Sequence, residues 1–322
     1  VLSFANHPNS VLNPENVPLP VIGPNQRAYL LEEAGVEGVL SLEFDAELAG
    51  LSAETFVTRY LVDALKAKAV IVGQGFRFGA GGAGTVDTLR ELGSKYGFTV
   101  REVAPVLLDG AVVSTTLVRN ALNAGDVVLA SEMLGRNHTT MGHIEHGLKI
   151  GRQIGFPTAN MERAAEGYLP LDGVYAGWLY CGTERYPAAL SVGVNATFQE
   201  VPRLIEAHIL DRDDVDLYDK LVTLEYVDFI RPSAKFDGVE SLIDGGAADG
   251  FTVVAGASLD QVIWRDEVLA EIVEVGAVVA SGIDGGIGIG DEVDLVPVLH
   301  AGILREGTAG HHGGADDFLP EP

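Results

Sequence analysis

The chain has 322 residues and carries 21 Lys and Arg against 46 Asp and Glu, a formal charge of −25. Hydrophobic residues make up 47% of it and charged residues 21%, which excludes a largely disordered protein. So acidic a balance argues against a nucleic-acid binder and against a partner of anionic membranes. The single cysteine, Cys181, excludes an intrachain disulfide framework and a cysteine-based zinc site.

The hydropathy pattern predicts neither a membrane span nor a secretory leader. No apolar run approaches the roughly 20 residues that cross a bilayer. The first residues, from Val1 to Pro8, contain no basic region followed by an apolar stretch. We therefore expect a cytoplasmic protein, and the sequence leaves its oligomeric state open.

The first 135 residues alternate between short apolar runs and helical patterns. The run from Ala69 to Gly73 is continuous and ends in glycine, which is typical of a parallel strand buried on both faces. Such alternation predicts a doubly wound parallel α/β sheet, with ligands at the carboxyl ends of the strands. The expected strands are 36–44, 69–73 and 98–106, and the expected helices are 52–65, 86–96, 115–123 and 126–134.

Between about residues 138 and 230, many short β-like runs are separated by turn signals. In the run 204–210, Glu206 and His208 fall on one strand face, opposite Ile205 and Ile209. The spacing predicts a small antiparallel β-barrel, closed by a helix around 239–243.

The last part of the chain has a different composition. Residues 251–322 contain 13 Asp and Glu, 2 Arg and 12 Gly. Their glycine-rich run 282–290 fits no regular element, and 307–322 has a composition typical of disorder. We therefore expect three parts: 1–135, 136–248, and an acidic extension 249–322 of unknown role.

The most specific motif is the decapeptide 151–160, GRQIGFPTAN. Gly151 and Gly155 allow close approach of a ligand to the backbone, and Arg152 lies between them. The Thr158 hydroxyl can ligate Mg²⁺, and the Asn160 amide can orient a phosphate or a metal-bound water. On composition alone, a structural turn is the more common interpretation of such a segment.

The decapeptide resembles the signature of riboflavin kinases, in which a Gly-Phe-Pro-Thr-Ala-Asn run binds ATP-Mg²⁺. Further motifs of that family follow in the same order, including 173–176, 191–198 and the strand 205–211. The resemblance implies a kinase that phosphorylates riboflavin to FMN with ATP. It implies that Thr158 and Asn160 hold Mg²⁺ and the phosphates, that Glu206 is the catalytic base, and that Gly151, Arg152 and Gly155 shape the phosphate-facing loop.

The N-terminal part resembles the FMN adenylyltransferase module of bifunctional bacterial riboflavin kinase/FAD synthetases. The similar stretches are 4–8 (FANHP), 72–79 (VGQGFRFG) and 114–119 (STTLVR). The resemblance implies an incomplete nucleotidylyltransferase-like domain in which Ser114, Thr115 and Arg119 bind nucleotide.

Both modules depart from the family pattern. The family's His-x-Gly-His motif occurs nowhere in the sequence, which begins just after the point where that motif is expected. Ala5, Gly75 and Val112 stand where the family has an acid, an Asn or Asp, and often an Arg. Because such groups stabilise charge during adenylyl transfer, we expect that activity to be weak or absent. In the kinase part, the departures are Ala196 and Leu148.

Other interpretations stay open at this stage. The glycines between Gly73 and Gly84 miss the dinucleotide-binding spacing. His143, Glu145 and His146 resemble metal ligands, but positions i and i+3 of a strand face opposite sides. The alternatives to a kinase alone are a full bifunctional enzyme and a non-catalytic flavin- or nucleotide-binding protein. A regulatory or partner-binding role for the acidic extension is a third possibility.

Overall fold

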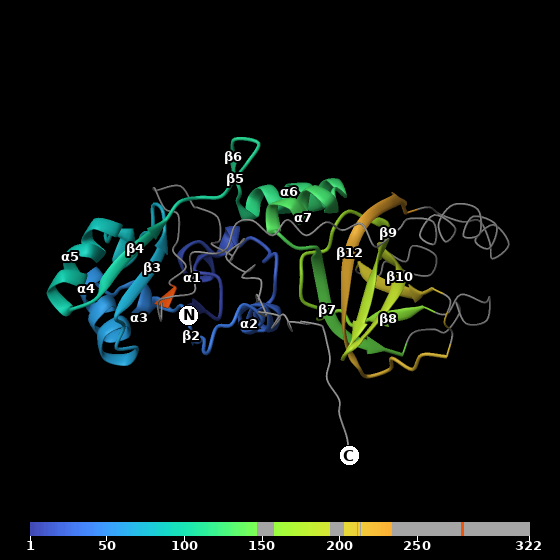
Figure 1. Ribbon diagram of the computed structural model, residues 1–322, viewed down its shortest axis with the longest axis horizontal. Helices are drawn as coiled ribbons and strands as arrows, with labels where there is room; N and C mark the ends of the chain where they lie inside the picture. Colours follow the sequence, from blue (N-terminus) through green and yellow to red (C-terminus); the bar gives the residue numbers. More distant parts are fainter. Residues whose placement is uncertain (147–157, 194–202, 211, 213, 234–277, 280–322) are drawn as a thin grey trace, which may run out of the picture.

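A computed structural model describes residues 1–146, 158–193, 203–210, 212, 214–233 and 278–279. An α/β part built from the first hundred residues and a β-barrel lie at opposite ends of the molecule, with two helices across the top between them (Figure 1). Among the described helices, none is long and apolar enough to cross a membrane.

The α/β part contains parallel strands, as the sequence predicts. Strand β1 (Leu2–Phe4) pairs with β2 (Leu40–Leu42), and β3 (Ala69–Gly73) pairs with β4 (Thr99–Val103). Strand β13 (Val278–Val279) pairs with the other edge of β3. The helical elements are α1 (Asn9–Leu12), η1 (Pro14–Asn16), α2 (Pro24–Glu33), α3 (Ala46–Ala49), α4 (Ala53–Phe56), η2 (Val57–Ala64), η3 (Ala80–Gly82) and α5 (Val86–Tyr96).

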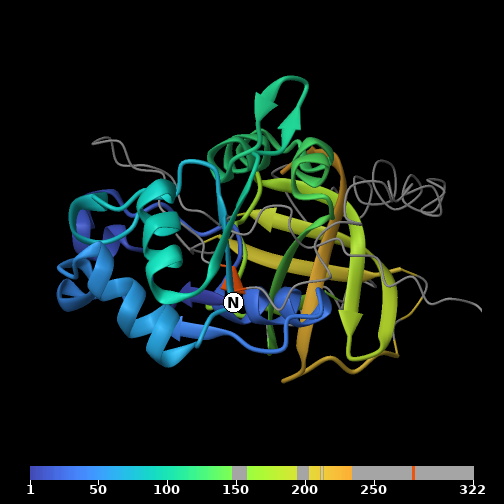
Figure 2. The same cartoon turned by 60° about the vertical axis from the view of Figure 1, so that its left-hand side comes forward.

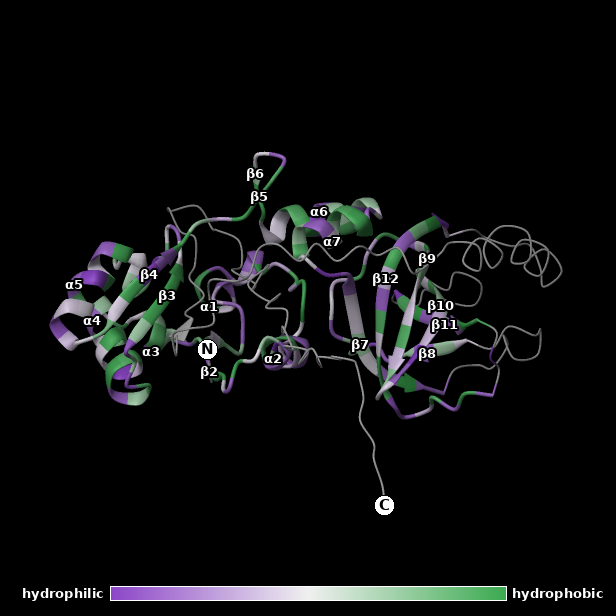
Figure 3. Cartoon of the chain, in the orientation of Figure 1, coloured by the Kyte–Doolittle hydropathy of each residue, from purple (hydrophilic) through white to green (hydrophobic). Residues whose placement is uncertain are grey.

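Local sequence signals explain several of these boundaries. Ser52 and Thr85 cap α4 and α5, because each hydroxyl accepts a hydrogen bond from the backbone N–H three residues later. In β3, the residues from Ala69 to Val72 are all buried, and Figure 3 shows this strand as hydrophobic along its length. The doubly wound α/β expectation is confirmed, although β2 and β4 are shorter than the runs that predicted them.

A projecting hairpin leads to the two helices between the ends of the molecule (Figure 1). Its strands are β5 (Leu107–Leu108) and β6 (Ala111–Val112). Helix α6 (Thr115–Ala124) is capped by Ser114 and helix α7 (Val127–Leu134) by Asp126. Both helices were expected from the sequence.

Six antiparallel strands form a closed barrel in the order β10-β11-β8-β7-β12-β9, which confirms the second half of the predicted fold. They are β7 (His138–Glu145), β8 (Ala159–Met161), β9 (Gly173–Cys181), β10 (Glu184–Gly193), β11 (Leu204–Ile209) and β12 (Leu221–Pro232). The helix expected at 239–243 lies outside the described residues.

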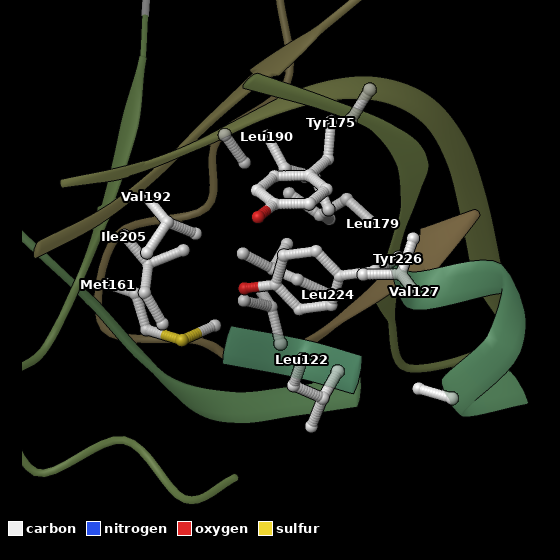
Figure 4. Close-up of a cluster of buried hydrophobic side chains, with 14 of the residues drawn as sticks. Leu122, Val127, Met161, Tyr175, Leu179, Leu190, Val192, Ile205, Leu224 and Tyr226 are labelled. Atoms are coloured by element: carbon white, nitrogen blue, oxygen red, sulfur yellow. The ribbon is translucent and has the colours of Figure 1, made fainter. Parts of the chain in front are cut away.

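The core of the barrel also includes the two connecting helices. Leu122 of α6 and Val127 of α7 pack with Tyr175, Leu224 and Tyr226 of the barrel in one buried cluster (Figure 4). Hydrophobic burial is the main favourable term in folding, so these helices are stabilised together with the barrel. The barrel core therefore includes side chains of the two helices that precede residue 135.

Helix α2 is attached to the barrel through its N-terminus. The Glu166 carboxylate accepts hydrogen bonds from the backbone N–H of Asn25 at 3.3 Å and of Gln26 at 2.9 Å. A side chain on Gly23 would collide with Glu166, so glycine permits this close approach. A carboxylate is favourable here because the helix N-terminus presents unpaired N–H groups and a partial positive charge.

One histidine is fully buried at the barrel wall. The Nε2 atom of His138 lies 2.7 Å from the carbonyl oxygen of Tyr168, and its ring stacks on Tyr226 with centroids 5.7 Å apart. Burial lowers the pKa of His138 from 6.5 to about 4, because the charged imidazolium is poorly solvated there.

This depressed pKa predicts acid sensitivity. Below pH 6.5 the unfolded chain binds a proton at His138 that the folded chain rejects, so stability falls until the pH reaches the folded pKa. Between pH 7.5 and 5, His138 should lower the free energy of unfolding by about 2 kcal/mol. Urea unfolding at the two pH values would measure this loss.

The control for this prediction is His138→Gln, which places an uncharged amide at the same position. Between pH 7.5 and 5, the free energy of unfolding of this variant should fall by about 2 kcal/mol less than that of the wild type. An equal pH dependence in the two proteins would show that His138 does not control acid sensitivity.

Candidate active site

Two of the residues expected to act together are direct neighbours in the barrel wall. Strands β8 and β11 pair with Asn160 opposite Glu206, which places both side chains on the same face of the sheet. Thr158 lies directly before β8, and its hydroxyl donates a hydrogen bond to the Glu206 carboxylate. The structure therefore brings Thr158, Asn160 and Glu206 together. Gly151, Arg152 and Gly155 lie outside the described residues.

The alternation of β11 explains the position of Glu206. Ile205, Ala207 and Ile209 are buried inside the barrel, whereas Glu206 and His208 face outward and are partly buried. This is the arrangement that the period of two predicted for the segment.

The environment of Glu206 favours proton uptake. Burial raises the pKa of its carboxyl group above the usual value, because desolvation disfavours the charged form. The hydrogen bond from Thr158 acts in the opposite direction and is the smaller effect. A carboxylate with a raised pKa is a stronger base than an exposed one, as a general base requires.

A second carboxylate lies on the other side of Asn160. Strand β7 pairs with β8 so that Glu145 is opposite Asn160, and Ser191 of β10 is opposite Glu206. The outer face of the barrel thus carries the row Glu145, Asn160, Glu206 and Ser191. Sequence reasoning did not assign Glu145 to the site, because the β7–β8 register that places it there is not visible in a local pattern.

The neighbouring histidines have structural contacts. The Nδ1 atom of His143 lies 3.0 Å from Glu162 Oε1, and the ring of His146 stacks on Tyr218 with centroids 4.0 Å apart. Within the described residues, no group of three or more His, Cys, Asp or Glu side chains could hold a metal ion. The donors at the site are instead a hydroxyl, an amide and carboxylates, hard oxygen groups that suit Mg²⁺ when substrate phosphates supply the remaining ligands.

The other expected nucleotide-binding residues gather at the start of α6. Ser114 accepts a hydrogen bond from the backbone N–H of Leu117, and Arg119 is buried with Nη2 3.4 Å from Thr115 Oγ1. Ser114, Thr115 and Arg119 therefore form one group, on a different element from the barrel strands that carry Glu206.

The remaining motifs of the α/β part lie after its strands. The Asn6 side chain bonds both the N–H and the carbonyl oxygen of Phe44, at 2.7 and 2.9 Å, and so fixes the segment after β1. After β3, Phe76 and Phe78 stack with centroids 5.5 Å apart inside the core. Gly75 lies between the end of β3 and Phe76. Its φ is +80°, a conformation that glycine adopts without strain.

Family models match both parts of the chain. The model for riboflavin kinase matches residues 134–252, and the model for FAD synthetase matches residues 1–117. Among curated proteins, the bifunctional riboflavin kinase/FMN adenylyltransferase of Pseudomonas fluorescens is 37% identical over 243 residues, which are 75% of this chain and 77% of that protein. The enzyme of the same name from Escherichia coli K12 is 32% identical over 253 residues, 78% of this chain and 80% of that protein.

A solved structure has the same overall fold. It is described as a macrolide-efflux protein from Streptococcus pneumoniae and matches with a TM-score of 0.68 and 32% identity, over 77% of this chain and 80% of that one. Taken with the barrel site and the matched sequence, these similarities show that the chain belongs to the bifunctional riboflavin kinase/FMN adenylyltransferase family.

Proposed function

We propose that this chain phosphorylates riboflavin with ATP to give FMN and ADP, with Glu206 as the general base. The observation that carries the assignment is the pairing of Glu206 with Asn160 across β8 and β11, together with the hydrogen bond from Thr158. A proton acceptor thus lies on the same patch of the barrel as two side chains whose oxygen atoms can bind a metal ion that carries the phosphates. Phosphoryl transfer needs mainly such positioning and charge neutralisation.

Each residue has a distinct task in the proposed reaction. Glu206 accepts the proton of the terminal ribityl hydroxyl while that oxygen forms a bond to the γ-phosphorus and the bond to ADP breaks. Thr158 and Asn160 would hold Mg²⁺, which neutralises the charge of the phosphates when it is bound. On the family resemblance, Gly151, Arg152 and Gly155 shape the loop that faces those phosphates.

A second activity, adenylyl transfer to FMN, is favoured by the match of residues 1–117 to FAD synthetases. Ser114, Thr115 and Arg119 would bind its nucleotide. Ala5, Gly75 and Val112 nevertheless stand where the family resemblance implies an acid, an Asn or Asp, and often an Arg. Because those groups stabilise the charge of the transferring phosphate, we propose that the kinase is the main activity. We place it in the cytoplasm, without a nucleic-acid partner.

The role of Glu206 is tested by Glu206→Gln, which keeps the size of the side chain and removes its basicity. Turnover in FMN formation should fall by a factor of about 10² to 10⁴, since this is the usual contribution of a general base. Riboflavin affinity, measured by quenching of flavin fluorescence, should change little.

The matched control is Glu225→Gln, a carboxylate on the outer face of β12 that hydrogen-bonds Asn137 at 2.9 Å. This variant should keep wild-type turnover. Normal turnover in Glu206→Gln would remove Glu206 as the base.

The division of activities is tested by separating flavins after incubation with riboflavin, ATP and Mg²⁺. FMN as the sole product is the expected result. Later appearance of FAD would show that adenylyl transfer proceeds despite the substitutions at Ala5, Gly75 and Val112. Bound riboflavin with no product would instead support a non-catalytic flavin-binding protein and contradict the kinase assignment.

A further inference from the structure

The row of side chains on the outer face of the barrel extends in both directions beyond the residues proposed for the kinase reaction. On one side, Glu145 is opposite Asn160, which is itself opposite Glu206. On the other side, Ser191 is opposite Glu206, and Val174 is opposite Ser191. Directly opposed residues project from the same face of a sheet, so neighbouring strands contribute one continuous row of side chains.

Glu145 is the last polar member of this row. It ends β7, which lies between β8 and β12 in the barrel wall, and both views show the green β7 beside the orange β12 (Figures 1 and 2). The pairing of β7 with β12 reaches only to His143, opposite Leu221. The side chain of Glu145 is exposed, and within the described part of the chain no hydrogen bond or ion pair involves its carboxylate. The carboxylate is therefore accessible to a ligand that lies along the row.

The direction of the row relates Glu145 to one of the two substrates. In phosphoryl transfer, the attacking and the leaving oxygens lie on opposite sides of the γ-phosphorus, roughly in line. In the proposed reaction, Glu206 contacts the attacking hydroxyl, and Asn160 holds the metal ion that carries the phosphates. The ADP portion therefore extends from Asn160 away from Glu206, which is toward Glu145. Riboflavin then lies on the side of Ser191.

The chemistry of the carboxylate limits which part of the nucleotide Glu145 can bind. An ionised carboxylate only accepts hydrogen bonds, so it cannot bind phosphate oxygens. The donors of ATP are the two ribose hydroxyls and the adenine amino group, and the hydroxyls are the nearer of these to the phosphates. Two carboxylate oxygens suit two adjacent hydroxyls, and acidic side chains bind ribose hydroxyls in dinucleotide sites.

We infer that Glu145 binds the 2′ and 3′ hydroxyls of the ATP ribose and so selects a ribonucleotide as the phosphate donor. The inference rests on the proposed kinase function, because it takes the direction of the nucleotide from the roles of Glu206 and Asn160. It adds a residue that determines nucleotide specificity, on a strand that carries none of the residues assigned to the reaction.

The inference is tested by comparing ATP with 2′,3′-dideoxy-ATP as phosphate donors in FMN formation at saturating Mg²⁺. In the wild type, kcat/KM should be at least about tenfold higher for ATP, since hydrogen bonds to a charged acceptor are stronger than neutral ones. In Glu145→Ala, this preference should fall to about one. The change should come from a higher KM for ATP, with kcat and the KM for the dideoxynucleotide close to those of the wild type.

The matched control is Glu225→Ala, which removes a carboxylate from β12 outside the row and should keep the wild-type preference for ATP. Equal kcat/KM for the two nucleotides in the wild type would overturn the inference, and so would the same preference in the wild type and in Glu145→Ala. A higher riboflavin KM or a higher Mg²⁺ requirement in Glu145→Ala, with the preference unchanged, would assign Glu145 to another ligand and also contradict it.

Failure of this inference is distinguishable from failure of the kinase assignment. FMN formation with an unchanged nucleotide preference in Glu145→Ala would contradict the role of Glu145 alone. The absence of FMN when the wild type is given riboflavin and ATP would contradict the proposed function, and with it the inference that depends on it.

Discussion

The pairing of the three-residue strand β8 with its neighbours is the constraint on which the barrel site depends. Strand β8 lies between β11 and β7 and is needed to close the barrel. Its central residue, Asn160, is fixed by both partners, opposite Glu206 on one side and Glu145 on the other. Because backbone pairing sets this register, the amide and the carboxylates are held in one row before any substrate binds, and less ordering is required on binding.

The same wall connects the barrel to the rest of the molecule. Glu166, which follows β8 by a few residues, binds the N-terminus of α2, and the helices α6 and α7 share the barrel core. Arg119 lies on α6, whose other residues Val118 and Leu122 are buried in that core. The residues expected to bind nucleotide in the α/β part therefore lie on or next to helix α6, which packs against the barrel. The two modules are thus connected by packing contacts, although each is identified by its own sequence motifs.

The sequence predicted the features that depend on local patterns, and it did not predict those that depend on contacts between distant segments. The helix 86–96 and the outward face of Glu206 and His208 follow from local patterns, and the structure has both as predicted. The position of Glu145 beside Asn160 depends on the register between two strands that are not consecutive in the sequence, since β7 ends at Glu145 and β8 begins at Ala159. The pairing of β13 with β3 joins residues about two hundred positions apart. The periodicity within one segment cannot predict such a contact, because the contact depends on which segments pair with each other.

The two modules also differ in what they have retained. At Gly75 the backbone has φ +80°, a region in which Asn and Asp are the most common residues besides glycine. The replacement of a family Asn or Asp by Gly75 therefore keeps the turn after β3 and removes only the polar side chain. Phe76 and Phe78 next to it stay in the core. The turn after β3 therefore keeps its conformation and its buried aromatic side chains, whereas the polar side chain that the family resemblance implies at position 75 is absent. In the barrel, the residues proposed for the kinase reaction, Thr158, Asn160 and Glu206, are all present and adjacent. This contrast supports the proposal that the kinase is the main activity.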